Sequence, residues 1–338
     1  MEKNIQKNAP KNASPLLEIR DLETWFYTED GVVRGCDRVS YRVDKGETLA
    51  VVGESGSGKS VTAMSVLGLI PDPPGRVVGG QVLFKGRNLL DMDSKEMQQI
   101  RGNRISMIFQ EPMTSLNPVM TVGRQIAESL VLHQGYSGKE AMVKAKEMLA
   151  MVGIPDPDAR AGEYPYQLSG GMRQRVMIAI ALACRPEVLI ADEPTSALDV
   201  TIQAQILGLM KRLQQEMGMA IILITHDMGV VAETADKVAV MYCGRVVEYG
   251  TAEDIFHDPR HPYLEGLRRS VLDIDADVEE LYMIRGSVPD PLDLPRGCSF
   301  APRCAHAMEI CEQKTPPAAY FSHTHHACCW LYREDHED

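Results

Sequence analysis

Apolar residues along the chain follow two different periods, and the change of period divides the sequence into regions. Residues 16–52 contain short apolar segments separated by the turns EDG and DKG, a pattern typical of antiparallel strands that lead into a buried strand. From residue 59 to about residue 69 the spacing is helical, until PDPPG ends it. Short strand patterns, GQVLFKG and ISMIFQ, return within residues 80–110. Helical periodicity then continues through residues 121–185, which predicts an inserted helical subdomain at about 116–185.

Two later apolar runs end in polar residues. VLIADEP (188–194) and AIILITHD (220–227) have the composition of parallel strands that are buried on both faces and carry functional residues at their carboxyl ends. After about residue 256 the alternation fades, prolines cluster and cysteines follow. The sequence therefore predicts an α/β fold with three parts: a disordered tail over 1–15, a main domain over 16–255 and an extension over 256–338.

Composition and charge narrow the class of protein. The chain has 338 residues, of which 44% are hydrophobic and 24% charged, so it can bury a full core. A formal net charge of −12 argues against a nucleic-acid partner, because phosphate backbones are bound mainly by Lys and Arg. No apolar run follows the lysines of MEKNIQKNAPKNASP, and no apolar stretch approaches the roughly 18 residues of a membrane span. We expect a soluble, cytoplasmic protein.

The segment GESGSGKS, residues 53–60, satisfies G-x-x-x-x-G-K-[ST] between a predicted buried strand and a predicted helix. Its glycines allow backbone N–H groups to turn inward around a phosphate, and the helix N-terminus adds partial positive charge. Lys59 is expected to reach the β- and γ-phosphates, and the Ser60 hydroxyl to ligate Mg²⁺. The flanks and the Lys-Ser ending disfavour an ordinary glycine-rich turn. The expected ATP contacts are Gly53, Ser55, Gly56, Ser57, Gly58, Lys59, Ser60 and Val61.

The strand VLIADE delivers two adjacent carboxylates, which are costly at the end of an apolar run unless a cation or a proton relay uses them. Asp192 is expected to hold Mg²⁺, and Glu193 to polarise an attacking water. His226 ends the next apolar strand and is expected to hydrogen bond to the γ-phosphate and that water. The alternative for His226 is a satisfied histidine at a sheet edge.

A further segment, LSGGMRQRVMIAIAL (168–182), places Ser-Gly-Gly at a helix start, another phosphate-binding geometry. With GESGSGKS, VLIADE, SALD (196–199) and His226 in this order, residues 16–255 resemble the ATPase subunits of ABC transporters. The resemblance implies a P-loop NTPase with a RecA-like core, an antiparallel β subdomain and the inserted helical subdomain. It also implies that LSGGM completes the ATP site of a second subunit across a head-to-tail dimer.

The resemblance assigns roles to further residues. Gln110 would ligate Mg²⁺ and sense the γ-phosphate as a catalytic residue beside Glu193 and His226, and EPMTSLNP would contact the membrane partner. An aromatic of TWFYTED should stack on adenine, with Phe26 or Tyr27 favoured over Trp25. Met172 departs from the glutamine usual in the signature. The expected contacts across the dimer are Ser169, Gly170, Gly171 and Asp199.

Five of the eight cysteines lie near the C-terminus. The segments DPRHPYLEGLRRS and VPDPLDLPRGC, with the pattern GC…RC…IC…CC, resemble the extension of the oligopeptide and dipeptide importer ATPases, whose four cysteines are similar to those of iron–sulfur proteins. A [4Fe–4S] cluster is favoured over zinc, because gaps of six and seven positions lack the usual C-x₂₋₄-C knuckle. A reducing cytoplasm disfavours disulfides. The expected ligands are Cys298, Cys304, Cys311 and Cys329, with Cys328 as the alternative to Cys329.

Other residues near these ligands have plainer interpretations. Histidines 323, 325 and 326 could replace a ligand, but a solvated loop is favoured. Cys36, Cys184 and Cys243 are expected to be small buried hydrophobes.

The resemblance implies an ATP-hydrolysing subunit, peripheral to the cytoplasmic face of the membrane, that powers import of dipeptides or oligopeptides. Its partners would be transmembrane permease subunits, a second ATPase subunit that need not be identical and, indirectly, an extracytoplasmic peptide-binding protein. Nickel chelates, oligosaccharides or glutathione are alternative cargoes. A soluble ABC ATPase that acts on ribosomes or DNA is the alternative from another class.

Overall fold

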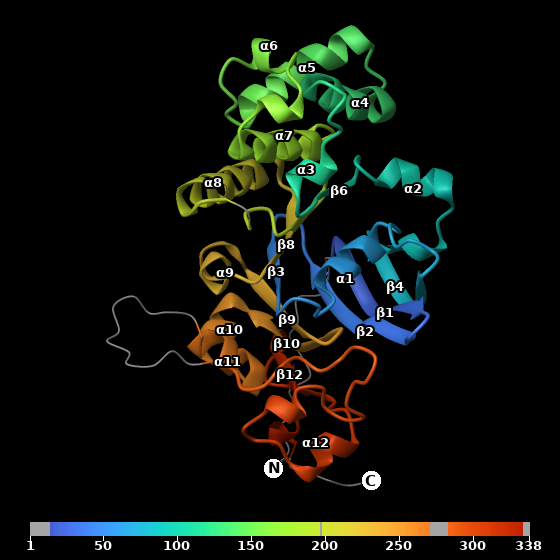
Figure 1. Cartoon of the computed structure of the whole chain (residues 1–338), viewed down its shortest axis with the longest axis vertical. Helices are drawn as coiled ribbons and strands as arrows, with labels where there is room; N and C mark the ends of the chain where they lie inside the picture. The colour runs from blue at the N-terminus through green and yellow to red at the C-terminus, as the bar shows by residue number, and fades with distance from the viewer. Residues whose placement is uncertain (1–13, 197, 271–282, 334–338) are drawn as a thin grey trace.

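The computed structural model describes residues 14–196, 198–270 and 283–333 and is built around a central eight-stranded sheet (Figure 1). From one edge to the other its strands are β11 (Ala318–Tyr320), β12 (His326–Cys328), β10 (Arg245–Thr251), β9 (Lys237–Tyr242), β3 (Thr48–Val52), β8 (Ala220–Thr225), β7 (Val188–Asp192) and β6 (Ile105–Ile108). The neighbours from β9 to β6 pair in parallel, whereas the pairs of β10, β11 and β12 are antiparallel. The predicted α/β class is confirmed.

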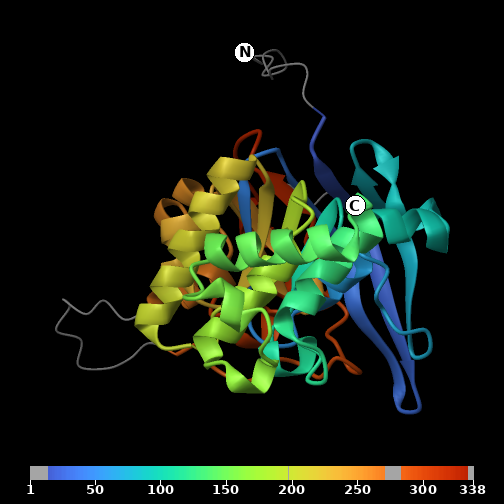
Figure 2. The same cartoon turned by 90° about the horizontal axis from the view of Figure 1, so that it is seen from above.

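Both faces of the central sheet are covered, which explains the continuous apolar runs of its strands. In β3, Leu49 and Val51 join one apolar cluster while Ala50 and Val52 join another. The first cluster is shared with a four-stranded antiparallel sheet, which stands on the opposite side of the central sheet from α8 and α9 (Figure 2). Its strands are β2 (Gly31–Val43), β1 (Leu17–Thr28), β4 (Gly75–Phe84) and β5 (Arg87–Asn88).

Twelve α-helices lie within the described residues, and four of them form the body of the helical subdomain at the top of Figure 1. Those four are α4 (Val122–Gln134), α5 (Gly138–Met151), α6 (Pro157–Arg160) and α7 (Gly170–Leu182). The others are α1 (Lys59–Val66), α2 (Ser94–Ile100), α3 (Pro112–Ser115), α8 (Val200–Met217), α9 (Met228–Thr234), α10 (Ala252–His257), α11 (Pro262–Arg269) and α12 (Glu309–Gln313). Buried side chains of α4, α5 and α7 share one core, as the helical periodicity predicts.

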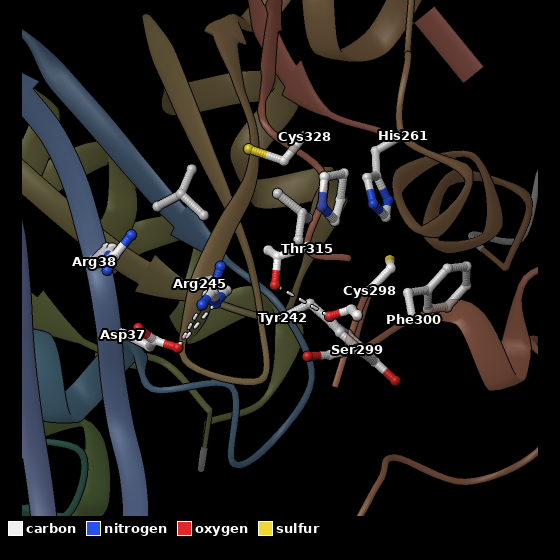
Figure 3. A pocket seen from close by; sticks show the side chains of 14 residues that line it. Asp37, Arg38, Tyr242, Arg245, His261, Cys298, Ser299, Phe300, Thr315 and Cys328 are labelled. Carbon is white, nitrogen blue, oxygen red and sulfur yellow. Dashed lines mark hydrogen bonds and ion pairs between the residues drawn. The ribbon is translucent and has the colours of Figure 1, made fainter. Parts of the chain in front are cut away.

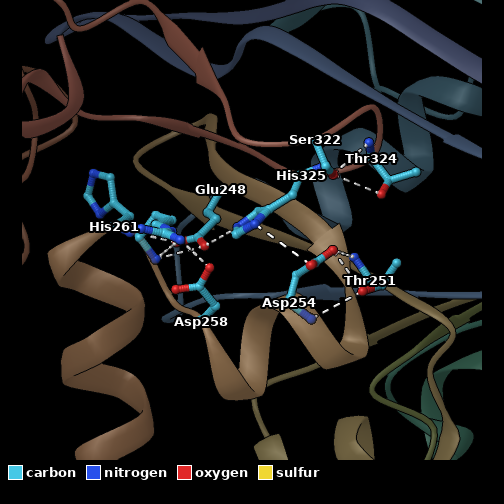
Figure 4. A network of polar contacts seen from close by, with 9 residues as sticks. Glu248, Thr251, Asp254, Asp258, His261, Ser322, Thr324 and His325 are labelled. Carbon is cyan, nitrogen blue, oxygen red and sulfur yellow. Dashed lines mark hydrogen bonds and ion pairs between the residues drawn. The ribbon is translucent and has the colours of Figure 1, made fainter. Parts of the chain in front are cut away.

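The extension contributes strands β11 and β12 to the central sheet. The loss of hydrophobic periodicity after residue 256 gave no indication of these strands. β12 pairs with β10 through Glu248 opposite Ala327 and Tyr249 opposite His326. The Glu248 carboxylate is fully buried and accepts hydrogen bonds from the backbone N–H groups of Arg260 and His261 (Figure 4). A buried carboxylate needs such donors, and His325 Nε2 supplies another at 2.9 Å.

His325 is only 2% exposed and His326 is half-buried in β12, so the solvated-loop prediction is wrong for these two residues, whereas His323 is exposed. His325 is buried because the buried Glu248 carboxylate needs hydrogen-bond donors. This requirement cannot be recognised from the sequence alone. Cys36, Cys184 and Cys243 are buried, as predicted, and Cys36 Sγ lies 3.1 Å from the Thr62 hydroxyl. Across the described ranges we find no helix whose length and hydropathy would suffice for a membrane span.

Candidate ATP site

The phosphate loop, Gly53–Ser60, runs from the end of β3 into the first turn of α1 and has a backbone that only glycine tolerates at two points. Gly53 and Gly58 have φ angles of 153° and 98°. A Cβ on Gly53 would lie 2.2 Å from the Met241 carbonyl oxygen, and one on Gly58 would lie 2.3 Å from the Gly35 carbonyl oxygen. The loop is therefore packed directly on β9 and β2, and its glycines are needed for close approach as well as for the turn.

Lys59 lies inside this loop and is only 6% exposed. Its Nζ donates to the carbonyl oxygens of Gly53 at 2.8 Å and Glu54 at 2.9 Å, and to Ser57 Oγ at 3.3 Å. Burial lowers the pKa of the Lys59 ammonium, which the carboxylates of Glu193 and Asp192 oppose. The ammonium thus occupies the hollow of the loop and is held by groups that a phosphate could replace.

Asp192 and Ser60 face each other beside the loop. Burial raises the pKa of the Asp192 carboxyl, and a hydrogen bond from the Ser60 hydroxyl opposes the rise. Asp192 Oδ1 is buried without a partner among the described residues. A buried carboxylate oxygen that lacks a donor, next to a hydroxyl, fits an Mg²⁺ site built from hard oxygen ligands.

Three predicted catalytic residues meet next to these ligands. Gln110 Nε2 donates to Glu193 Oε2 at 3.1 Å, and His226 Nδ1 lies 3.3 Å from Glu193 Oε1. Glu193 has a φ of 44°, unusual for a residue other than glycine, and its backbone N–H donates to the Ile224 carbonyl. Such backbone strain is common at functional sites. The arrangement can orient a water molecule at the open side of the Glu193 carboxylate.

The two favoured adenine contacts differ in their surroundings. The Phe26 ring lies against Gly35 and Gly75, and Val61 of the first turn of α1 also approaches Gly35. Tyr27 is 51% exposed. Phe26 is thus the one of the two whose ring lies beside Gly35 together with Val61, which directly follows the phosphate loop, and its contact with adenine stays a prediction.

Ser169, Gly170 and Asp199 are exposed, whereas Gly171 is half-buried. Ser169 caps α7 by accepting from the Met172 N–H at 3.3 Å, and Asp199 caps α8 by accepting from the Ile202 N–H at 3.0 Å. Figure 1 shows α7 in the helical subdomain, apart from α1. The structure therefore brings one set of predicted site residues together and leaves the signature residues outside it. That set consists of the phosphate loop, Asp192, Glu193, Gln110 and His226.

Residues beyond the predicted set also contact the phosphate loop. The Glu54 backbone N–H donates to the Tyr263 hydroxyl at 2.9 Å, and the Glu54 carboxylate pairs with Arg303. Glu54 and Arg303 stand 249 positions apart, and no local sequence signal connects them.

Comparison with known proteins agrees with this geometry. Residues 36–196 match the family described as ABC transporter, and residues 247–311 match the oligopeptide/dipeptide transporter C-terminal region. The chain is 53% identical to the oligopeptide transport ATP-binding protein OppD of Bacillus subtilis, with 95% of this chain and 90% of that one aligned. It is 51% identical to AppD of the same organism, over 95% and 98% of the two chains. The chain belongs to the family of oligopeptide and dipeptide transport ATP-binding proteins.

This ABC ATPase also resembles solved structures. It is similar to a dimeric ATP-binding cassette captured after hydrolysis with ADP and phosphate, with a TM-score of 0.63, 28% identity and coverage of 70% of this chain and 98% of that one. CbiO1 of Clostridium perfringens, part of an ABC transporter complex, gives a TM-score of 0.62 at 28% identity, over 73% of this chain and 92% of that one. The predicted ABC ATPase fold is confirmed.

Proposed function

We propose that this subunit hydrolyses ATP at sites shared with a second ATPase subunit and that hydrolysis drives import of peptides. The observation that carries the proposal is that the predicted ATP contacts form two separate groups, one buried around the phosphate loop and one exposed at helix starts. Lys59 is buried in the phosphate loop, where the carboxylates of Glu193 and Asp192 act on its ammonium. Ser169 and Asp199 are instead exposed residues that cap the starts of α7 and α8. An exposed Ser-Gly-Gly helix start suits the γ-phosphate of a nucleotide that a facing subunit holds.

The residues of the chain suggest how the reaction proceeds. Lys59 would exchange the carbonyls of Gly53 and Glu54 for phosphate oxygens, while Ser60 and Asp192 would hold Mg²⁺. Bound Mg²⁺ would offset the negative charge of the phosphates. Glu193 would accept a proton from the attacking water, and Gln110 and His226 would keep its carboxylate in place.

Peptide cargo rests on the relatives, which are named oligopeptide and dipeptide transport ATP-binding proteins. Transmembrane permease subunits would be the direct partners, and an extracytoplasmic binding protein would deliver the cargo to them. This subunit would then act at the cytoplasmic face of the membrane. Uptake of labelled dipeptides, oligopeptides, nickel chelates, oligosaccharides and glutathione by the reconstituted transporter separates the candidate cargoes.

The catalytic assignment is tested with Glu193→Gln. We expect kcat for ATP hydrolysis to fall about 100-fold or more, because general base catalysis contributes that much, while ATP binding persists. Gel filtration with ATP should show a stabilised closed dimer. Lys59→Ala serves as the contrast, since it should weaken ATP binding itself. Hydrolysis at the wild-type rate in Glu193→Gln would remove this residue from the mechanism.

We further propose that Cys298, Cys304, Cys311 and Cys329 hold a [4Fe–4S] cluster. Backbone N–H groups donate to the sulfurs, from His306 to Cys304 at 3.4 Å and from Met308 to Cys311 at 3.5 Å. Such hydrogen bonds stabilise ligating thiolates and are among the means by which proteins tune these clusters. The described residues contain no group of three or more His, Cys, Asp or Glu side chains placed to bind a metal ion.

The surroundings of Cys328 and Cys329 differ, and the difference supports Cys329 as the proposed fourth ligand. Burial raises the pKa of Cys329 to about 11, and the neighbouring thiols of the three other proposed ligands contribute to the rise. Cys328 instead lines a cavity of about 180 Å³ together with Cys298 and Arg245 (Figure 3). The pKa of Cys329 is thus affected by all three other proposed ligands, whereas that of Cys328 is affected by Cys298 alone among them.

Metal analysis of anaerobically purified protein tests the cluster. We expect about four iron and four sulfide per chain, the stoichiometry of such a cluster, and their loss in Cys329→Ser. Cys328→Ser is the matched control and should retain them. One zinc ion without iron would overturn the cluster, and retention of iron in Cys329→Ser would move the ligand to Cys328.

A further inference from the structure

A single arginine of the extension reaches the phosphate loop. Arg303 Nη1 lies 2.9 Å from Glu54 Oε2, and Arg303 Nη2 lies 3.2 Å from Glu54 Oε1. The Arg303 side chain is 6% exposed and that of Glu54 is 27% exposed. The pair is bidentate and largely withdrawn from solvent, unlike the ordinary surface ion pairs that contribute little.

Other groups fix the Arg303 guanidinium in this position. Its Nη1 donates to the Tyr242 hydroxyl at 3.2 Å, and its Nε donates to the Arg285 carbonyl at 3.1 Å. The rings of Tyr242 and Phe300 lie 5.8 Å and 5.9 Å from the guanidinium carbon. A lysine could not replace this planar fork, because an ammonium cannot pair with both carboxylate oxygens in the same geometry.

Aromatic packing connects the extension to the same place. Phe300 packs against Tyr242 and Tyr263 with ring centroids 5.3 Å and 5.4 Å apart, and the two tyrosine rings are 4.7 Å apart. Tyr242 ends β9, Tyr263 lies in α11, and Arg303 ends a 3₁₀ turn over Ala301–Arg303 that follows Phe300. The docking of Phe300 therefore determines where Arg303 points.

Glu54 is the residue through which this contact could affect the nucleotide. Its backbone N–H donates to the Tyr263 hydroxyl, and its carbonyl oxygen accepts from Lys59 Nζ at 2.9 Å. Both the side chain and the N–H of Glu54 are thus held by residues of the C-terminal part of the chain, while its carbonyl holds the lysine of the phosphate site.

We propose that Arg303 is a positioning residue for the ATP site: it fixes Glu54, so that the loop Gly53–Ser60 keeps the conformation that binds phosphate only while the extension is docked. The proposal rests on the proposed function, in which this loop binds ATP. Cys304 directly follows Arg303, so a group bound at the proposed cysteine site would act next to this arginine. The extension would then adjust ATP affinity without contacting the nucleotide.

The test compares Arg303→Gln with Arg260→Gln in the full-length protein. Arg260 also lies in the extension and packs within it, since its guanidinium carbon lies 4.6 Å from the centroid of the Phe321 ring. We expect Arg303→Gln to raise Kd and KM for ATP about tenfold with a smaller change in kcat, because a displaced loop binds phosphate less well. Arg303→Lys should recover only part of the loss. Arg260→Gln should leave Kd and KM unchanged.

A double-mutant cycle shows whether the effect passes through Glu54. In a Glu54→Gln background, Arg303→Gln should change Kd by less than twofold, since the carboxylate it acts on is gone. Equal Kd in wild type and Arg303→Gln, with equal melting temperature and iron content, would overturn the proposal. So would a full tenfold effect in the Glu54→Gln background, or a similar loss in Arg260→Gln. Absence of ATP hydrolysis in the wild type would instead count against the proposed function.

Discussion

The two halves of the proposed ATP site differ in how the fold supports them. The phosphate loop is packed on β9 and β2, its lysine is buried, and Tyr263 and Arg303 hold it from the C-terminal side. The signature loop begins a helix at the surface, and its Ser169 caps that helix in the open. One half is thus supported within the chain, whereas the other is available to a facing subunit. The difference predicts that substitutions in the first half affect both stability and activity, whereas substitutions of the exposed residues in the second half affect activity far more than stability.

The largest expected effect lies on the exposed half. Ser169→Arg should lower kcat about 100-fold or more, because a bulky cation would replace a γ-phosphate contact made across the dimer. ATP binding to the isolated subunit should change little, and loss of the Ser169 cap should lower the free energy of unfolding by about 1 kcal/mol. Steady-state kinetics, nucleotide titration and thermal unfolding measure the three quantities.

Ser137→Arg is the control for the loss of a helix cap. Ser137 caps α5 by accepting from the Glu140 N–H at 3.4 Å, much as Ser169 caps α7. It should lose a similar amount of stability, about 1 kcal/mol, and keep full activity. Equal loss of kcat in both variants would mean that capping rather than contact with ATP explains Ser169.

The next expected effect is a pH dependence of stability in the half of the site that contains the phosphate loop. His261 caps α11, the helix of Tyr263, by accepting from the Tyr263 N–H through Nδ1. Burial lowers the pKa of His261 to about 4, from an ordinary value of 6.5. Below pH 6.5 the His261 imidazole is therefore protonated in the unfolded chain but stays neutral in the folded chain. The free energy of unfolding should fall as pH falls from 6.5 toward 4. The loss amounts to about 2 kcal/mol by pH 5.

Denaturant unfolding at several pH values, compared between wild type and His261→Asn, isolates this contribution. Asparagine keeps an acceptor for the helix N-terminus but does not titrate in this range. The wild type should lose about 2 kcal/mol more than the variant between pH 7 and pH 5. If the free energy of unfolding fell equally with pH in the two proteins, groups other than His261 would be responsible for the acid sensitivity.

Sequence reasoning predicted the parts of the site that depend on local physics. The phosphate loop requires glycines at fixed positions, and strands buried on both faces require apolar runs such as VLIAD and AIILIT. These constraints act over a few residues, so they can be read from one chain. Glu193 and His226 were predicted at the carboxyl ends of apolar strands, whereas Gln110 was assigned by resemblance to the ABC ATPases; in the structure both Gln110 and His226 contact Glu193.

The contacts that the sequence did not predict join distant segments or have no local pattern. The polar stretch SHTHHA gives no sign that His325 is buried against Glu248. β12 has three residues, too few for a periodicity, although it extends the central sheet. Arg303 and Glu54 each look like ordinary surface charges until the fold brings them together. Pairing of this kind depends on tertiary structure, which propensity and periodicity do not encode.

The smallest expected effect concerns Met172, the residue that departs from the usual signature. Its side chain is half-buried and packs against the core of the helical subdomain, while its N–H donates to Ser169. Met172→Gln should therefore lower the free energy of unfolding by about 1 kcal/mol or less, since a polar amide would replace an apolar contact. Because the backbone hydrogen bond to Ser169 survives, kcat and KM should stay within about twofold of the wild type. A tenfold rise in kcat with unchanged stability would show instead that the side chain at this position contacts the facing nucleotide, and that the signature half depends on more than its exposed Ser-Gly-Gly.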